Sequence, residues 1–166
     1  MPGKTIVLDH DRVQRKLTRI VHQLHEEYHA EKGIVIVGVV PRGLMLARRL
    51  AAGLTEATDL LVDLVELRLD KDAPLERPAH LSVEPATLRD RVVVLVDDVL
   101  MSGRTLMHAA SFLVQVPLRK LTTVVLVDRR HRTYPIRADI VGLTLSTTLQ
   151  EHISVELGTK DRVYLV

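Results

Sequence analysis

Three apolar segments rich in β-branched residues constrain the fold more than any other feature of the sequence: Ile34–Val40, Val92–Val96 and Leu121–Val127. The first two precede segments with helical spacing, which run through about Gly53 and over Gly103–Val116. Short strands that alternate with helices predict right-handed crossovers and a parallel sheet that is covered on both faces. We therefore expect an α/β fold with a central parallel sheet flanked by helices.

Several other elements have weaker signals. Arg12–His29 places its apolar residues on one helical face, and it follows Asp9 and Asp11, either of which would cap the helix. Leu61–Leu69 has the composition of another strand. Three weaker strands are expected towards the end of the chain: Ile140–Val141, Ile153–Leu157 and Val163–Leu165.

The segment Asp70–Glu84 is polar, contains Pro74 and Pro78, and has little periodicity. Long segments without regular structure in compact domains are often lids over a functional site. We expect a long flexible lid loop here.

Composition supports the same fold class. A chain of 166 residues, 46% of them hydrophobic, can bury one sizeable core, so we expect a single domain over 1–166. Aromatic residues make up 2% and Trp is absent, so the core must consist of Val, Leu, Ile and Ala, as in a parallel sheet.

The same composition limits location and partners. There is no cysteine, no charged-then-apolar leader at Met1–Asp9, and no apolar run near the length of a membrane span. We therefore expect a cytoplasmic protein without membrane contact. The formal charge of +2 suits an anionic small molecule or RNA and does not distinguish them.

The segment Val92–Thr105 carries the clearest chemistry. Its apolar strand ends in Asp97-Asp98, and a turn with Ser102 and Gly103 then starts a helix. Backbone N–H groups at a helix start, together with hydroxyl groups, can bind a phosphate, and glycine permits its close approach. Two adjacent carboxylates can accept hydrogen bonds from vicinal ribose hydroxyls and hold Mg²⁺ through water.

A purely structural role for this segment is the alternative. In that interpretation the acids merely end a strand and the Ser-Gly pair merely starts a helix. Adjacent carboxylates beside a buried strand repel each other and lose hydration, which disfavours the structural interpretation.

Loops that follow neighbouring parallel strands meet at the carboxyl edge of the sheet. Three such loops are expected to converge: Pro41-Arg42-Gly43, Asp97–Thr105 and Asp128–Arg132. Together they contain paired carboxylates, a turn with hydroxyl groups and several arginines. This combination predicts a site for a polyanion.

The run Val94–Thr105 resembles the phosphoribosyl-pyrophosphate signature of type I phosphoribosyltransferases. Other segments are similar in order and spacing to the bifunctional pyrimidine-operon attenuator/uracil phosphoribosyltransferase family. They are Leu17–His22, Val40–Gly43 with Leu46–Leu50, and Val127–Arg132 with Pro135–Asp139. The resemblance covers about Lys4 to Leu157.

The resemblance implies a fold with a small hood and a role for each matching residue. Asp97 and Asp98 would hold the ribose hydroxyls and Mg²⁺, and Ser102 to Thr105 would bind the 5′-phosphate. Arg42 would bind pyrophosphate, a role that its charge and forked geometry suit. The further substrate-binding residues would be Val99, Leu100, Met101, Gly103, Arg104, Pro41, Gly43, Arg132 and Arg137.

The implied activity is Mg²⁺-dependent transfer of phosphoribose from phosphoribosyl pyrophosphate to a pyrimidine base, uracil above all, giving UMP and pyrophosphate. Closure of the lid would exclude water from the reacting carbon. Family members also associate through faces that include the first helix, so a homo-oligomer is expected.

The sequence departs from the family pattern at five positions. Pro41 stands where the family has Thr, Met101 where it has an aromatic residue, and Arg130 where it has Gly, while Leu143 and Leu149 lie where it has Lys. We expect these changes to affect the base pocket and the RNA surface. Methionine cannot exchange a proton with a base nitrogen, which disfavours a purine substrate.

Two basic clusters have open interpretations. Arg12, Arg15, Arg19 and His22 share one stripe of the first predicted helix, either as a solvated face or as an RNA-facing surface. A second cluster either pairs with Asp128 and Asp139 or contacts substrate directly; it comprises Arg129, Arg130, Arg132 and Arg137.

A short histidine pattern gives one more hypothesis. His25 and His29 flank Glu26 at the spacing of zinc proteases, yet no third ligand follows, so a solvated helix end is favoured.

The rival to an enzyme is an RNA-binding regulator of pyrimidine gene expression that only senses nucleotides or phosphoribosyl pyrophosphate. Asp97, Asp98, Arg42 and the lid favour turnover, because a sensor needs affinity but no stabilisation of a leaving group.

Overall fold

The computed structural model describes residues 3–148 and 150–166. The first two residues of Met1–Asp9 and the departure from the family pattern at Leu149 lie outside the described residues. The elements, in chain order, are β1 (Thr5–Leu8), α1 (His10–Tyr28), β2 (Gly33–Val39), α2 (Arg42–Ala57), β3 (Leu61–Arg68), β4 (His80–Leu81), the 3₁₀ helix η1 (Pro85–Leu88), β5 (Val92–Leu100), α3 (Arg104–Leu113), β6 (Lys120–Asp128), β7 (Ile140–Thr144), β8 (Ile153–Glu156) and β9 (Arg162–Leu165).

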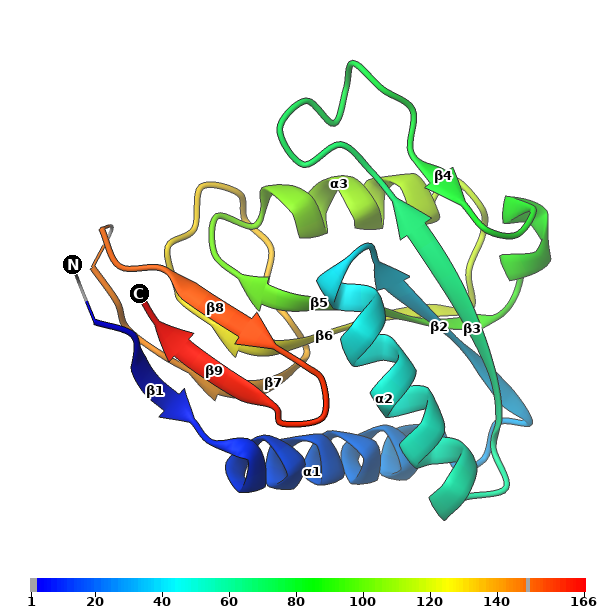
Figure 1. Cartoon of the computed structure of the whole chain (residues 1–166). Helices are drawn as coiled ribbons and strands as arrows, with labels where there is room; N and C mark the ends of the chain where they lie inside the picture. The colour runs from blue at the N-terminus through cyan, green and yellow to red at the C-terminus, as the bar shows by residue number, and fades with distance from the viewer. Residues whose placement is uncertain (1–2, 149) are drawn as a thin grey trace.

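The larger sheet has the strand order β4-β3-β2-β5-β6-β7 (Figure 1). Strands β3, β2, β5, β6 and β7 run parallel, and the short edge strand β4 pairs antiparallel with β3. β5 lies between β2 and β6, with Val94 paired to both Ile36 and Thr122. The expected α/β fold with a central parallel sheet is therefore confirmed.

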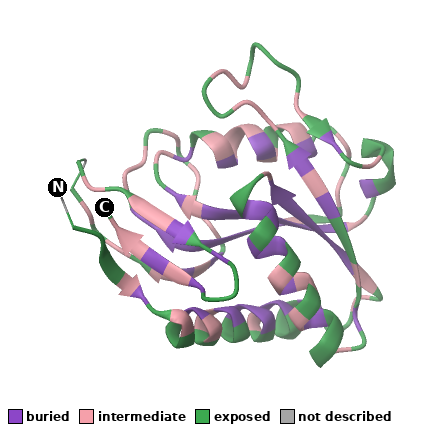
Figure 2. Cartoon of the chain, viewed as in Figure 1, coloured by how far each residue is buried: buried purple, intermediate pink, exposed green. Residues whose placement is uncertain are grey.

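Alternate residues of each central strand supply two separate apolar layers. Ile36 and Val94 face the layer covered by α1 and α2, whereas Val37 and Leu95 face the layer that contains α3. Figure 2 shows the resulting burial of the sheet between the helices. Burial on both faces explains why these strands are apolar along their whole length.

Helix α1 agrees closely with its predicted span. The Asp9 carboxylate accepts a hydrogen bond from the Arg12 backbone N–H at 2.9 Å, so Asp9 rather than Asp11 is the cap. The buried residues of α1 follow the predicted apolar stripe; they are Val13, Leu17, Ile20, Val21, Leu24 and Tyr28.

A second, three-stranded sheet forms the hood in the order β1-β9-β8. Its register joins residues from the two ends of the chain, with Thr5 opposite Leu165. The fully buried carboxylate of Asp161 accepts a hydrogen bond from Arg49 of α2 at 2.9 Å. This ion pair attaches the β8–β9 turn to the main body of the molecule.

Three predicted boundaries were wrong. The segment Asp70–Glu84 is not one continuous loop, because His80–Leu81 pairs with β3. Helix α2 continues to Ala57, beyond the expected end at Gly53, while α3 ends at Leu113, before Val116. Leu54, which is buried, continues the core-facing side of α2 beyond Gly53, and local composition gives little information about where a helix stops.

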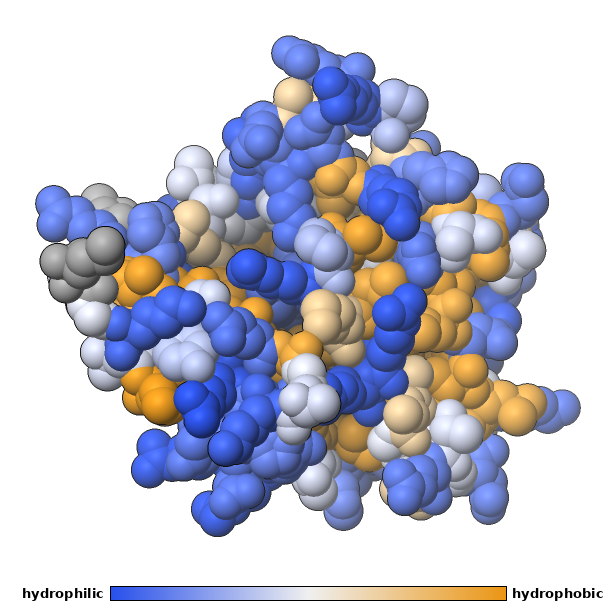
Figure 3. Space-filling model, viewed as in Figure 1, coloured by the Kyte–Doolittle hydropathy of each residue, from blue (hydrophilic) through white to orange (hydrophobic). Residues whose placement is uncertain are grey.

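The face of the molecule drawn in Figure 3 carries an apolar area. In Figure 3 hydrophobic residues gather over α2 and β3, and the exposed side chains there include Met45, Leu61 and Leu64. Within 3–148 and 150–166, no helix is both long and apolar enough to cross a membrane.

Candidate active site

The loop after β2 and the end of β5 touch each other. A Cβ atom on Gly43 would lie 2.7 Å from the Val96 carbonyl oxygen and 3.0 Å from the Asp97 Cα, so only glycine fits without displacement. The Val40–Pro41 peptide that precedes this turn is cis. The predicted convergence of the Pro41–Gly43 turn with the paired acids is therefore observed.

The turn between β5 and α3 has the geometry of an anion-binding loop. Gly103 has φ of +85°, a left-handed conformation that glycine adopts at little cost, and α3 starts at the next residue. The Ser102 hydroxyl accepts a hydrogen bond from the Arg104 N–H at 3.2 Å. A helix start of this kind directs backbone N–H groups and positive dipole ends at a bound anion.

The loop after β6 is hydrogen-bonded to the turn between β5 and α3. Thr133 and Tyr134 both donate backbone hydrogen bonds to the Ser102 carbonyl oxygen, at 2.8 and 2.9 Å. Arg132 donates to the Met101 carbonyl oxygen at 2.9 Å and forms an ion pair with Asp128 at 2.7 Å. These contacts make the Arg132 guanidinium part of the supporting structure of the loop.

A pocket of about 260 Å³ lies where these loops meet. Seven of the residues predicted for the site line it: Asp97, Val99, Leu100, Met101, Ser102, Gly103 and Thr105. The lining does not include the others, which are Asp98, Pro41, Arg42, Gly43, Arg104, Arg132 and Arg137.

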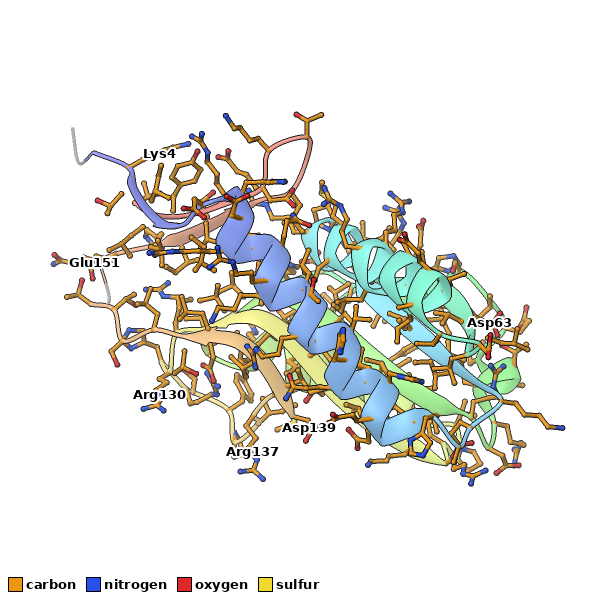
Figure 4. All side chains as sticks on the ribbon, turned by 90° about the horizontal axis from the view of Figure 1, so that it is seen from below. Lys4, Asp63, Arg130, Arg137, Asp139 and Glu151 are labelled. Atoms are coloured by element: carbon orange, nitrogen blue, oxygen red, sulfur yellow. The ribbon has the colours of Figure 1, made fainter. Side chains whose placement is uncertain are left out.

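Several of these remaining residues still lie close to the pocket wall. The Asp98 backbone N–H donates to the Asp97 carboxylate at 2.9 Å, and Gly43 contacts Asp97 as described above. Arg137 is different, because its exposed side chain lies with that of Arg130 at the outer edge of the molecule in Figure 4.

The lining also contains residues that were not predicted for the site: Leu106, Val125, His152 and Ile153. It further contains Lys71, from the predicted lid, and Arg129, for which direct substrate contact was one of two interpretations. Arg129 is only 3% exposed, and it donates to the Thr147 hydroxyl and the Met101 sulfur, each at 2.9 Å. Its place directly after a buried strand was the available signal, but a cluster of arginines does not reveal which side chain turns inward.

The pocket has an unusual carboxyl group. Burial and the neighbouring Asp98 raise the pKa of Asp97 from its ordinary value of 3.8 to about 8, although the Lys71 ammonium opposes this change. A cation placed beside this carboxyl group would strongly stabilise its ionised form. Oxygen ligands of this type suit Mg²⁺.

In the basic stripe on α1, which comprises Arg12, Arg15, Arg19 and His22, one side chain is already bound to the protein itself. Arg19 donates from Nη2 to the carbonyl oxygens of Val141 and Gly142, at 3.0 and 2.7 Å, so it holds α1 against β7. Arg12, Arg15 and Lys16 line a shallow groove together with Leu143 and Leu145.

The histidine pattern at the end of α1 has no metal-site geometry. The rings of His25 and His29 meet edge to face with centroids 6.4 Å apart, and the His29 ring is hydrogen-bonded to the Glu26 carbonyl oxygen. Throughout the described part of the chain, no three His, Cys, Asp or Glu side chains are grouped to hold a metal ion.

The parallel sheet, the hood and the loop at the start of α3 together define the type I phosphoribosyltransferase fold. Hypoxanthine phosphoribosyltransferase of Trypanosoma cruzi has this fold, with a TM-score of 0.76 and 17% identity over 91% of this chain and 85% of the other. The Staphylococcus aureus enzyme gives a TM-score of 0.74 and 19% identity, over 87% and 80%.

The family model described as phosphoribosyl transferase domain matches residues 4–160, and the chain belongs to this family. Its curated relatives include proteins named bifunctional protein PyrR. That of Enterococcus faecalis is 39% identical over 97% of this chain and 93% of its own length, and that of Bacillus subtilis is 35% identical over 100% and 97%. The family resemblance predicted from the sequence is confirmed.

Substitution of Asp97 should change how folding stability depends on pH. Because its pKa is about 8 in the folded state and 3.8 ordinarily, wild-type Asp97 holds a proton between these values only when folded. Its contribution to stability is therefore complete below about pH 4 and is lost as the pH rises towards 8.

Asp97→Asn removes this dependence. Urea unfolding with a metal chelator present should show the variant gaining stability relative to wild type from pH 4 to pH 8. A difference in unfolding free energy that stays constant over this range would contradict the assigned environment of Asp97.

Proposed function

We propose that this phosphoribosyltransferase transfers phosphoribose from phosphoribosyl pyrophosphate to a pyrimidine base, with uracil as the preferred base, in a Mg²⁺-dependent reaction. The observation that carries the proposal is the pocket in which a buried carboxyl group, Asp97, faces a helix-start loop with two hydroxyl groups. A sugar phosphate needs both features at once, since its phosphate binds N–H and hydroxyl donors and its hydroxyls bind carboxylates.

The proposed role of each residue follows from its position around the pocket. Ser102 to Thr105 would bind the 5′-phosphate through backbone N–H groups and two hydroxyls. Asp97 and Asp98 would bind the ribose hydroxyls and hold Mg²⁺, which supplies charge neutralisation to the pyrophosphate when it is bound. Arg42, which starts α2 and precedes the glycine that approaches Asp97, would bind pyrophosphate with the backbone of Pro41 and Gly43.

The preference for uracil is supported by Ile153 and Met101 in the pocket lining. Arg129 holds the Met101 side chain there, because its guanidinium already donates to Met101, Thr147 and the carbonyl oxygens of Thr148 and Glu151. Ile153 of the hood offers an apolar surface to the ring. Met101 accepts from Arg129 and has no proton to give a purine nitrogen, in keeping with a pyrimidine.

The lid would complete the site. The segment between β3 and β4 projects beside α3 in Figure 1, and Lys71 near its start reaches the pocket. Its closure over bound phosphoribosyl pyrophosphate would exclude water while the bond to pyrophosphate breaks and a base nitrogen bonds to the same carbon.

Pyrophosphate release tests this function. Phosphoribosyl pyrophosphate and Mg²⁺ are incubated with uracil, cytosine, orotate, hypoxanthine or guanine, and nucleotides are identified by mass spectrometry. Release with uracil and formation of UMP are expected. The double variant Asp97→Asn, Asp98→Asn should lower the rate by at least about a hundredfold with its circular dichroism unchanged.

Release with a purine base instead of uracil would contradict the proposed base, while leaving the phosphoribosyl site in place. Full activity of the double variant would contradict the assignment of the two carboxylates.

A second function, RNA binding, is favoured by a separate observation. The relatives are named bifunctional, and Arg12, Arg15 and Lys16 line a groove on α1, away from the phosphoribosyl pocket. Cations in such a groove can bind RNA phosphates. The chain would then also act as a regulator of pyrimidine gene expression.

Filter binding to leader RNA of a pyrimidine operon, over a range of salt concentrations, tests the second function. Arg12→Gln with Arg15→Gln should weaken binding and reduce the salt slope by about 1.4 to 1.8, as expected for two lost phosphate contacts, without changing base transfer. Equal affinity and slope for both proteins would exclude the groove as the RNA site.

A further inference from the structure

Met101 is a sulfur-containing side chain at the edge of the pocket described above. The chain has four methionines and no cysteine, so thioethers are its only sulfur groups. Met101 lines the pocket and is 41% exposed, so a small solute in the pocket can reach its side chain. Exposed thioethers are common sites of oxidation by peroxides, which convert an apolar side chain into a polar sulfoxide.

A buried guanidinium lies against the Met101 sulfur. Arg129 is 3% exposed, and its Nη1 atom is 2.9 Å from the sulfur. The other nitrogens of this group have oxygen acceptors, since Nε donates to the Thr147 hydroxyl and Nη2 to the carbonyl oxygens of Thr148 and Glu151. Within the described residues, the sulfur is thus the one acceptor that Nη1 reaches. A thioether is a weak acceptor, so this charged and buried donor has a poor partner.

Oxidation of the sulfur by hydrogen peroxide would supply a better acceptor. A lone pair of the sulfur forms a bond to one peroxide oxygen, the O–O bond breaks, and the other oxygen leaves as water after proton transfer. The sulfur is oxidised to the sulfoxide and the peroxide is reduced to water. The Arg129 guanidinium beside the sulfur stabilises the negative charge that develops on oxygen in this step, and it can donate to the sulfoxide oxygen afterwards.

Met45 provides a comparison within the same chain. It lies on α2, outside the pocket lining, and its exposure of 39% is close to the 41% of Met101. Of the methionines that the structure describes, Met101 is the one whose sulfur accepts a hydrogen bond. If exposure alone governed oxidation, Met45 and Met101 would react at similar rates, whereas stabilisation by Arg129 favours Met101.

We propose that Met101 is a site of reversible oxidation by peroxide, whose sulfoxide is held by Arg129 and closes the part of the pocket that takes the base. This inference rests on the proposed function, in which Met101 and Ile153 offer apolar contacts to the base. The sulfoxide replaces one of these contacts with a polar group. A methionine sulfoxide reductase with two thiols reverses the change, releasing water and a disulfide. The turn Ser102–Thr105 keeps its phosphate donors throughout.

Timed exposure of the full chain to hydrogen peroxide tests the proposal. Catalase ends each reaction, and peptide mass spectrometry measures the sulfoxide at Met101 and at Met45. Calorimetry then measures the binding of UMP, which carries the base, and of pyrophosphate with Mg²⁺, which does not. Met101→Leu removes the proposed site, and Met45→Leu is the matched control, because Met45 has similar exposure outside the pocket.

Met101 should oxidise at least about fivefold faster than Met45, and saturating UMP should slow oxidation at Met101 alone. After treatment, wild type and Met45→Leu should bind UMP about tenfold more weakly than before, and pyrophosphate within about twofold. Treated Met101→Leu should keep its own initial UMP affinity. Incubation of treated wild type with the reductase and dithiothreitol should restore UMP binding.

Equal oxidation rates at Met101 and Met45 would overturn the proposal. The same holds for complete Met101 sulfoxide with unchanged UMP affinity, or for an equal loss of UMP affinity in treated Met101→Leu. If untreated wild type binds neither UMP nor pyrophosphate, the proposed function itself fails, whereas the relative oxidation rates at the two methionines still decide the chemistry of Met101.

Discussion

The structure depends on a carboxyl group buried at the end of its central strand. β5 is apolar from Val92 to Val96 and then presents Asp97 and Asp98, which are 4% and 6% exposed. Burial of two adjacent acids is costly without compensation. Lys71, whose Nζ lies 4.0 Å from the Asp97 carboxylate, offsets part of this cost, and the raised pKa of Asp97 shows that the rest is not offset. In the proposed function, a ligand that brings a cation and sugar hydroxyls would complete this arrangement.

Several arginines around the pocket hold the fold together and do not line the pocket. Arg132 joins Asp128 to the turn at Met101, Arg19 fixes α1 to β7, and Arg49 pairs with Asp161 to hold the hood. These arginines fix the relative positions of the three loops and the hood, and precise placement of a reacting carbon requires such rigidity. These arginines therefore hold the fold around the pocket rather than line it.

The sequence predicts the sheet and the turn between β5 and α3 because both depend on local patterns. Composition is enough to recognise the strand at Val92–Val96 and the turn at Ser102–Thr105. The resemblance to the family then extends the prediction to the whole fold. β1 was not foreseen, since its four residues pair with β9 across almost the whole chain. Lys71 and Arg129 were not assigned either, because only tertiary structure determines which cation of a loop faces inward.

We propose that the carboxyl edge of the larger sheet binds phosphoribosyl pyrophosphate. The most direct measurement is a crystal structure of the chain with this ligand and Mg²⁺. We expect the 5′-phosphate to bind the N–H groups of Ser102–Thr105, with the ribose hydroxyls beside Asp97 and Asp98. A ligand bound elsewhere, or bound there with its ribose hydroxyls directed away from both carboxylates, would contradict it.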